Sequence, residues 1–324
     1  MTGTTADLQL LARFEAGLDP RRPEHGAVPA RVLHHGEMST IMTIGGKGAP
    51  ALVYKRMPAF DTADEAGHYE ALHRRYVRML GERAGVKVAA STTVRLPDAS
   101  GKYQIVYIMQ ELIPEDALCH MATYRMSPAD VGRLVMGILN ETAKVFDLNR
   151  NSRDTEIGFD ADMSNWAIAG YDADRGGLPS RFRLVYLDTN TPLMRRNGHE
   201  LFDVEPFLRP APAAILPLIR RTVLPDLMSR YYDFRRMAIG LVGRFYDEGR
   251  HELVPGMIDA VNWFFLAERR ESHFQPVTVE DVKRFHRWDR FIWRAFTLVC
   301  RVDRRIKYAQ RRRYPYILPA RRRQ

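Results

Sequence analysis

The chain contains 324 residues, of which 45% are hydrophobic and 27% are charged, a composition typical of a globular protein with one large or two medium domains. Its formal net charge is +10, but the segment 301–324 holds ten Lys or Arg and one Asp, a net +9, so the other 300 residues carry about +1. The sequence has no run of 18 apolar residues, no basic-then-apolar leader and no CxxC, HExxH, GxSxG or GxxxxGK[ST] motif, which argues against transmembrane, secreted, zinc-binding, hydrolase and Walker-type proteins. Because Cys119 and Cys300 are the only cysteines, we expect a reducing, cytoplasmic location.

The first 110 residues are predicted to form mostly strands and one helix. The strand segments are short apolar or β-branched runs bounded by turn residues, and they lie at 30–44, 51–57, 86–96 and 103–112. Between them, the stretch from Asp61 to about Arg83 has the period of a helix, and its apolar face consists of Tyr69, Leu72, Tyr76 and Leu80.

The remainder of the chain is predicted to be mainly helical. Ser127 is a predicted N-cap for a helix that begins at Pro128. The phrases "GFDADMSNWAIAG" (158–170) and "RFRLVYLD" (181–188) indicate a β-hairpin, and amphipathic helices with Pro breaks follow beyond residue 205. The predicted fold class is therefore α+β, with a small β-rich part followed by a larger helical part.

Several polar residues occupy distinctive positions on these predicted elements. Lys55 ends a strand, Glu70 lies on the following helix, and Asp160 precedes Asn165 by five residues. Asp188 ends the second strand of the hairpin, where a carboxylate beside an apolar strand is costly unless its charge is used. Pairing of the hairpin strands is expected to bring Asn165 near Asp188, so that both oxygens can reach one Mg²⁺ ion. A nucleotide phosphotransferase needs these parts: a cation for the phosphates, an acid to orient it, a base and metal ligands.

The phrases "LVYK", "MQELIP", "DADMSN" and "VYLDTN", together with the helix acid, resemble the motifs of the protein-kinase-like fold, in particular those of the aminoglycoside and choline phosphotransferase branch. The resemblance extends over roughly residues 30 to 195. It implies a bilobal fold, with a small β-rich N-lobe that contains one helix and a larger helical C-lobe. Two positions depart from the family: Gly158 stands where a His usually precedes the catalytic Asp, and the metal phrase reads D-T-N.

The resemblance also implies residue roles. Lys55 would hold the α- and β-phosphates of ATP, Glu70 would orient Lys55, and Asp160 would be the catalytic base. Asn165 and Asp188 would bind Mg²⁺.

The resemblance further implies that the linker backbone from Gln110 to Ile113, including Glu111, would contact the adenine. Two rivals remain open, namely Glu65 for the role of the helix acid and Asp162 for that of the base, although Asp162 lacks the five-residue spacing to the Asn.

The expected organisation is an N-terminal extension, an N-lobe, a C-lobe and a basic tail, at 1–29, 30–112, 113–300 and 301–324. We expect an ATP- and Mg²⁺-dependent phosphotransferase acting on a small-metabolite hydroxyl or similar acceptor, with nucleotidyl transfer left open. The alternative is a catalytically weak kinase-like binding module whose basic tail holds RNA, a membrane or an acidic protein. Trp263, Trp288 and Trp293 lie in helical stripes and are predicted core residues. The sequence does not define the acceptor or an oligomeric state.

Overall fold

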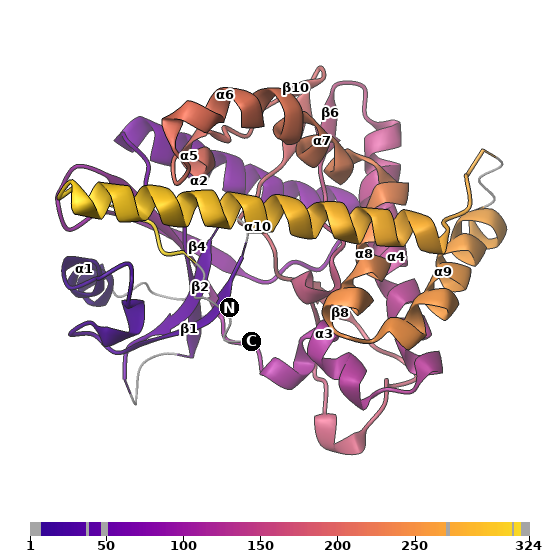
Figure 1. The fold of residues 1–324 in the computed structure, drawn as a ribbon. Coiled ribbons are helices and arrows are strands. Elements are labelled where there is room, and N and C mark those ends of the chain that lie inside the picture. The colour runs from indigo at the N-terminus through magenta and orange to yellow at the C-terminus, as the bar shows by residue number, and fades with distance from the viewer. Residues whose placement is uncertain (1–7, 37–38, 47–50, 270–272, 313, 319–324) are drawn as a thin grey trace.

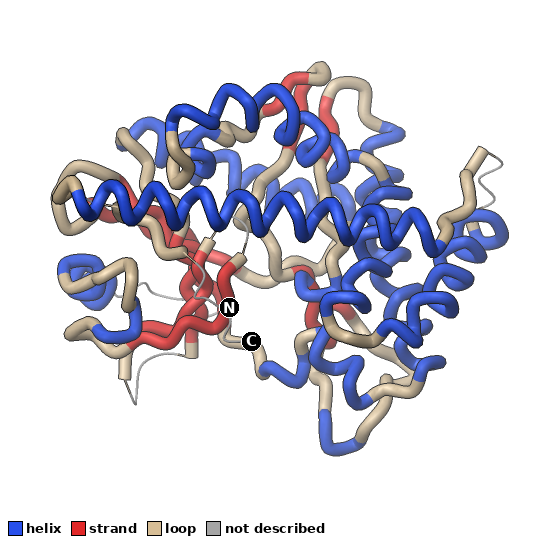
Figure 2. The backbone as a smooth tube through the Cα atoms, viewed as in Figure 1, coloured by secondary structure: helices blue, strands red, loops and turns tan. Residues whose placement is uncertain are grey.

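A computed structural model of the chain describes residues 8–36, 39–46, 51–269, 273–312 and 314–318. A five-stranded antiparallel sheet and one packed helix form a small lobe, and a larger, mainly helical lobe follows it (Figures 1 and 2). The predicted α+β, bilobal architecture is confirmed.

The N-lobe sheet has the strand order β1-β2-β3-β5-β4, with every neighbouring pair antiparallel. Its strands are β1 (Ala30–His35), β2 (Thr40–Ile44), β3 (Leu52–Arg56), β4 (Ser91–Pro97) and β5 (Gln104–Glu111). All four predicted strand segments are present. Because β3 lies between β2 and β5, its side chains are central in the sheet, and Lys55 pairs with Ile41 on one side and Ile108 on the other.

The helix that crosses this sheet is α2 (Ala63–Arg78), and it begins where the sequence places an N-cap. The Thr62 side chain accepts a hydrogen bond from Glu65 N at 3.1 Å, which satisfies one free amide of the first turn. The chain continues into a π-helical turn (Met79–Ala84) and ends at Gly85, whose φ of 74° favours glycine. The predicted apolar face is buried.

The two faces of the sheet have different coverings, because side chains alternate along each strand. The inner face packs against α2 and the C-lobe within one large apolar core. The outer face packs against a nine-residue helix, α1 (Leu8–Ala16), and against Tyr314 and Tyr316 near the C-terminus. The helix α1 was not predicted from the sequence.

The C-lobe is built mainly from α4 (Pro128–Asn151), α8 (Phe234–Asp247) and α9 (Val254–Trp263). Shorter helices are α3 (Cys119–Ala122), α5 (Glu205–Leu208), α6 (Leu216–Leu218) and α7 (Leu224–Ser229). Two small antiparallel sheets complete the lobe: β7 (Trp166–Ile168) with β8 (Leu184–Tyr186), and β6 (Thr155–Ile157) with β9 (Met194–Arg196) and β10 (His199–Glu200). The predicted cap of α4 is confirmed, since the Ser127 side chain accepts from Asp130 N at 3.2 Å.

The longest helix, α10 (Val279–Ala309), lies across both lobes (Figure 1). It packs on α8 of the C-lobe, and the residues that follow it reach the outer face of the N-lobe sheet. The predicted boundary between C-lobe and basic tail, at residue 300, therefore falls inside a continuous helix. No helix among the described residues is long and apolar enough to cross a membrane.

Candidate functional site

Lys55 lies on the inner face of β3 and is buried against the segment that follows β8. Its Nζ donates to Leu187 O at 2.6 Å and to Asn190 Oδ1 at 3.1 Å. Burial lowers the pKa of Lys55, and the charge of Asp188 opposes that shift. The structure therefore brings the predicted phosphate-binding lysine to the segment that carries the predicted metal aspartate.

Glu70 does not contact Lys55, which corrects the predicted pairing. Its carboxylate forms an ion pair with Arg95 of β4, with 3.7 Å between Oε2 and Nε. Consecutive helix residues point about 100° apart, so Glu70 cannot share the direction of Tyr69, which is buried against the site. The rival Glu65 is also engaged elsewhere, at 2.9 Å from Arg209 Nη2.

In place of a carboxylate, α2 presents two tyrosines and a histidine to the site. Tyr69 Oη donates to Asn190 O at 2.8 Å, and His73 Nε2 lies 3.1 Å from Thr189 Oγ1. Tyr76 Oη donates to Gly158 O at 3.0 Å. Burial, together with the positive charges of Lys55 and Arg74, lowers the pKa of His73 to about 4. The helix therefore positions the segment 188–190 with neutral side chains.

The predicted hairpin has the expected register. Trp166 of β7 pairs with Tyr186 of β8, and Leu187 N donates to Asn165 O at 2.8 Å. These contacts bring the residue before β7 beside the residues that follow β8. The sequence predicted that strand pairing brings Asn165 near Asp188, and the structure joins the Asn165 carbonyl to the backbone of Leu187, the residue directly before Asp188.

Asn165 and Asp188 provide an amide and a carboxylate oxygen, a donor set that suits Mg²⁺. Proteins often bind this ion through one or two carboxylates, while phosphate oxygens and water complete its octahedral shell. Burial raises the pKa of Asp188, whereas Lys55 and the Asn190 amide lower it. In the described part of the chain, no three His, Cys, Asp or Glu residues cluster as a metal site. An ion at this position would therefore need ligands from a bound nucleotide.

Asp160 lies half-buried on the loop before β7, beside two other carboxylates. One oxygen accepts from Asp162 N at 3.0 Å, and the Asn165 side-chain amide lies 3.5 Å from the Asp160 carbonyl. Burial and the negative charges of Asp162 and Asp188 raise the pKa of Asp160 to about 7. A carboxylate with this pKa can both accept and release a proton near neutral pH.

The rival Asp162 has structural partners instead. It caps the short turn Met163–Asn165 by accepting from Ser164 N at 2.8 Å, and it forms an ion pair with Arg244 of α8 at 3.0 Å. Burial alone would raise the pKa of Asp162, but Arg244 and the Ser164 hydrogen bonds hold it below its ordinary value. Its hydrogen-bonding capacity is thus largely occupied by the fold.

The glycine at the position of the family's usual His has a packing reason. A Cβ atom on Gly158 would lie 2.7 Å from Leu193 Cβ and 2.9 Å from the Tyr232 ring. Real side chains do not approach so closely. Leu193 and Tyr232 therefore occupy the space that a histidine side chain would need, while Tyr76 binds the Gly158 carbonyl.

The predicted adenine-binding linker begins within the sheet. Glu111 is the last residue of β5 and pairs with Leu52, and Leu112 N donates to Ala51 O at 2.9 Å. Buried Gln110 donates to Leu187 O at 3.1 Å, the same carbonyl that Lys55 binds. Ile113 is half-buried just beyond this strand end. The linker and the lysine thus share one anchor on the segment after β8.

Residues from both lobes lie close together near the loop that carries Asp160 and Asp162. His34 lies at the end of β1, near enough to Arg244, His120 and Asp162 for their charges to act on it. Burial and the positive charges of Arg244 and His120 lower the pKa of His34. The end of β1 therefore lies near the loop that carries Asp162.

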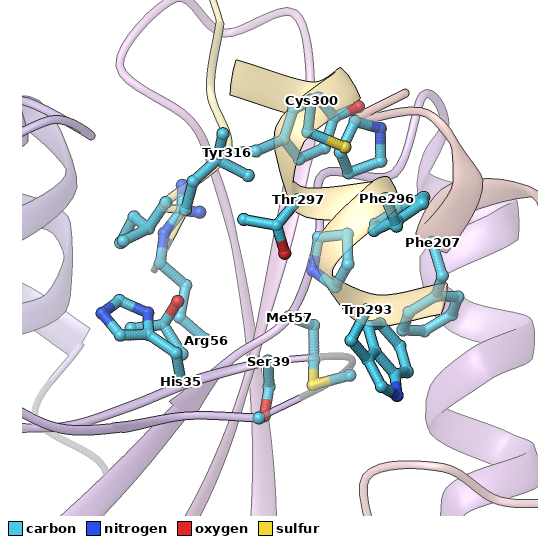
Figure 3. Close-up of a pocket in the computed structure, with 16 residues that line it drawn as sticks. His35, Ser39, Arg56, Met57, Phe207, Trp293, Phe296, Thr297, Cys300 and Tyr316 are labelled. Atoms are coloured by element: carbon cyan, nitrogen blue, oxygen red, sulfur yellow. The ribbon is translucent and has the colours of Figure 1, made fainter. Parts of the chain in front are cut away.

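Two cavities lie away from these residues. One, of about 250 Å³, lies between the β1–β2 hairpin, the end of β3 and the inner side of α10, with Ser39, Arg56, Trp293 and Thr297 in its wall (Figure 3). The other, of about 810 Å³, lies between α2 and β4, and His73 is part of its wall. Neither is lined by Lys55, Asp160, Asn165 or Asp188.

Sequence reasoning missed His73, Tyr69 and Asn190 as parts of the site. Asn190 lies in the phrase "VYLDTN", two residues after the predicted metal aspartate. His73 follows Tyr69 by four residues on the helix face that was predicted to be buried. His73 could have been found from the sequence, because it is a polar residue on a helix face that is otherwise apolar.

The antiparallel sheet with α2, the helical second lobe and the order of the lysine, linker, loop and hairpin segments define a protein-kinase-like fold. A family model matches residues 46–304, so the chain belongs to the family of unknown function DUF6206.

Among solved structures, the chain is similar to the GDP and kanamycin complex of APH(2'')-IIIa. The two share 10% sequence identity with a TM-score of 0.32, over 76% of this chain and 94% of the other. No curated protein matches the chain.

Proposed function

We propose that the protein is an ATP- and Mg²⁺-dependent phosphotransferase that acts on a hydroxyl or similar acceptor group of a small metabolite. One observation carries this proposal: Lys55 binds the carbonyl of Leu187, directly before Asp188, while the hairpin joins Leu187 to Asn165. Three chain segments thus contribute a cation, a carboxylate and an amide to one place. Phosphoryl transfer depends mainly on such positioned charge.

In this proposal each residue has a distinct role. Asp160 accepts the proton of the acceptor hydroxyl while the hydroxyl oxygen attacks the γ-phosphorus of ATP. The bond between that phosphorus and the bridging oxygen breaks, and ADP leaves with that oxygen. Lys55 places its charge on the α- and β-phosphates. Asn165 and Asp188 would hold Mg²⁺, which neutralises phosphate charge when bound. The pKa of Asp160, about 7, suits a base that works near neutral pH.

A nucleotide-binding protein without transfer activity is the second candidate. The observation that favours it is the absence of a carboxylate from α2 at Lys55, since Glu70 pairs with Arg95. In active kinases an acid on this helix orients the lysine. Here Leu187 O and Asn190 Oδ1 hold the lysine instead.

Nucleotide affinity and ATP consumption measured on the same samples distinguish the two candidates. Asp160→Asn is expected to bind ATP and Mg²⁺ within a small factor of the wild type, while turnover falls by roughly 10²–10⁴. Asp174→Asn, the same change on an exposed turn outside the site, is the matched control and keeps both. Lys55→Met is expected to weaken nucleotide binding itself.

Two results would decide against the first candidate. Equal turnover in the wild type and Asp160→Asn would exclude Asp160 as the base. A wild type that binds ATP but does not consume it, with any acceptor supplied, would favour the second candidate. If Asp162→Asn abolishes turnover in a folded protein while Asp160→Asn does not, the base is Asp162.

A further inference from the structure

The outer face of α10 carries a row of exposed apolar side chains. Its members lie on one side of the helix at spacings of three, four or seven residues: Trp288, Phe291, Leu298, Val302 and Ile306. Phe291 is 61% exposed and Leu298 58% exposed. The predictions that Trp263 and Trp288 are core residues are wrong, since they are 56% and 48% exposed, and Trp288 stacks on Phe291. A surface helix of a globular protein normally turns such an apolar row toward the protein core.

A second row, of basic side chains, runs beside the apolar row. Its exposed members follow the same helical spacing: Lys283, Arg287, Arg290, Arg294 and Arg305. At 100° per residue, this row occupies the sector adjacent to the apolar row on the outer face. The two rows together extend along most of a helix that is about 46 Å long.

The acidic residues of α10 point the other way. Asp281 pairs with Arg235 at 2.8 Å, and Asp289 pairs with Arg230 at 2.5 Å, both toward the C-lobe. Asp303 is buried. Only Glu280, at the start of the helix, is an exposed acid, and it pairs with Arg287 of the basic row at 2.8 Å. The helix therefore directs its negative charge inward and presents positive charge outward.

The inner face of α10 is fixed to the body of the protein, so the outer face is the one left for a partner. Phe285 packs so close to Gly240 of α8 that a Cβ atom on Gly240 would lie 3.3 Å from the Phe285 ring. Val282 and Cys300, on the same face of α10, are buried. In Figure 1, α10 crosses the front of both lobes and no other described element is drawn over it.

We propose that this outer face of α10 docks on an anionic phospholipid bilayer, with the apolar row inserted among the headgroups and the basic row on lipid phosphates. Charge complementarity supports lipid as the occupant, because the exposed charges are almost all positive. Trp and Phe beside Arg on a surface helix are typical of interfacial binding. Pairing with a second copy would bring two basic rows into one interface, which is unfavourable. This inference does not depend on the proposed function.

Co-sedimentation of the full-length protein with phosphatidylcholine vesicles, with and without phosphatidylglycerol, tests the proposal. The protein is expected to sediment with the anionic vesicles only, and less at high salt. Arg287→Glu/Arg294→Glu and Phe291→Ser/Leu298→Ser are each expected to weaken binding by roughly tenfold or more. Matched controls are Arg75→Glu/Arg78→Glu on α2 and Leu218→Ser on α6, which alter exposed residues elsewhere and leave binding unchanged.

Three outcomes would overturn the proposal. The first is no binding of the wild type to anionic vesicles. The second is equal binding by the α10 variants and the controls. The third is a dimer in light scattering that Phe291→Ser/Leu298→Ser dissociates, which would assign the face to a second copy. Binding to RNA that the apolar variants leave intact, without vesicle binding, would assign the basic row to nucleic acid. Unchanged melting temperatures confirm that the variants are folded.

Discussion

Lys55 and Arg56 are neighbours on β3, yet the two buried cations have opposite surroundings. Arg56 points to the outer face of the sheet, where Glu15 of α1 binds its Nε at 2.6 Å and its Nη2 at 3.1 Å. Pro315 O accepts from Nη1 at 3.2 Å, and Tyr107 Oη donates to Glu15. Although burial opposes it, the Glu15 carboxylate raises the pKa of Arg56. This cation is neutralised by direct contact.

Lys55 points to the inner face and has only uncharged hydrogen-bond partners. Its acceptors are a carbonyl and a side-chain amide, and no carboxylate in the described chain lies within ion-pair distance of it. Burial lowers the pKa of Lys55, whereas contact with Glu15 raises the pKa of Arg56. A buried cation with a complete ion pair belongs to the framework of the fold. A buried cation without one retains charge for a bound anion, which is the role proposed for Lys55.

The largest expected effect is on stability, and it separates the two cations. Arg56→Met leaves Glu15 buried without a counter-charge and is expected to lower the free energy of unfolding by about 3–5 kcal/mol. Lys55→Met removes no contact ion pair and is expected to cost less than half as much. Urea unfolding of both variants measures the difference. Equal losses would show that the two sites do not differ in this way.

The C-terminal residues are expected to contribute to the outer face through packing rather than charge. Deleting residues 310–324 removes buried Tyr314 and Tyr316 and the Pro315 contact of Arg56, at a cost of roughly 2–4 kcal/mol. The control Arg311→Ala/Arg312→Ala removes charge and leaves the tyrosines, and its melting temperature is expected to stay near that of the wild type. A stable truncation would show that the outer face does not need this segment.

On the inner face, His73 is expected to make the protein sensitive to acid. Its pKa of about 4 lies below the ordinary value of 6.5, so the unfolded chain binds a proton at higher pH than the folded protein does. Stability is therefore lost as the pH falls from about 6.5 toward 4, by about 2 kcal/mol between pH 7 and pH 5. His73→Gln should flatten this part of the stability curve. An unchanged slope would mean that His73 is not buried as a neutral group.

Asp160 is expected to have the opposite effect on the pH dependence of stability. Its pKa of about 7 lies above the ordinary 3.8, so the folded protein binds the proton more tightly, and stability falls as the pH rises from about 4 through 7. Asp160→Asn removes this titration and is expected to gain about 2–3 kcal/mol at pH 8 relative to its effect at pH 5. Thermal unfolding at the two pH values measures the gain. Its absence would indicate a carboxylate with an ordinary pKa.

Much of the fold could be predicted because its signals are local. Alternating apolar runs, turn residues and the Ser127 cap identify the sheet, the hairpin and α4. The helix α1 was missed because its burial depends on distant partners, above all the pairing of Glu15 with Arg56. The basic segment after residue 300 was predicted to be a tail because charge counts do not reveal that α10 continues to Ala309.

The site divides in the same way between local and distant determinants. Strand pairing alone predicted that Asn165 and Asp188 lie close together, since their hairpin is local. Which residue of α2 faces Lys55 depends on the rotation of that helix, where one residue changes the direction by about 100°. The partner of Glu70, Arg95, lies on another strand and cannot be predicted from spacing.

The course of the chain between the lobes also limits how the two lobes can move apart. The chain leaves the sheet once, after Glu111, and α10 returns it to the sheet, where Tyr314 and Tyr316 pack. The chain therefore connects the two lobes twice, once through the segment after Glu111 and once through α10. Any movement of the lobes that keeps both connections intact is therefore constrained at two points. A wider opening requires the two tyrosines to leave the sheet first.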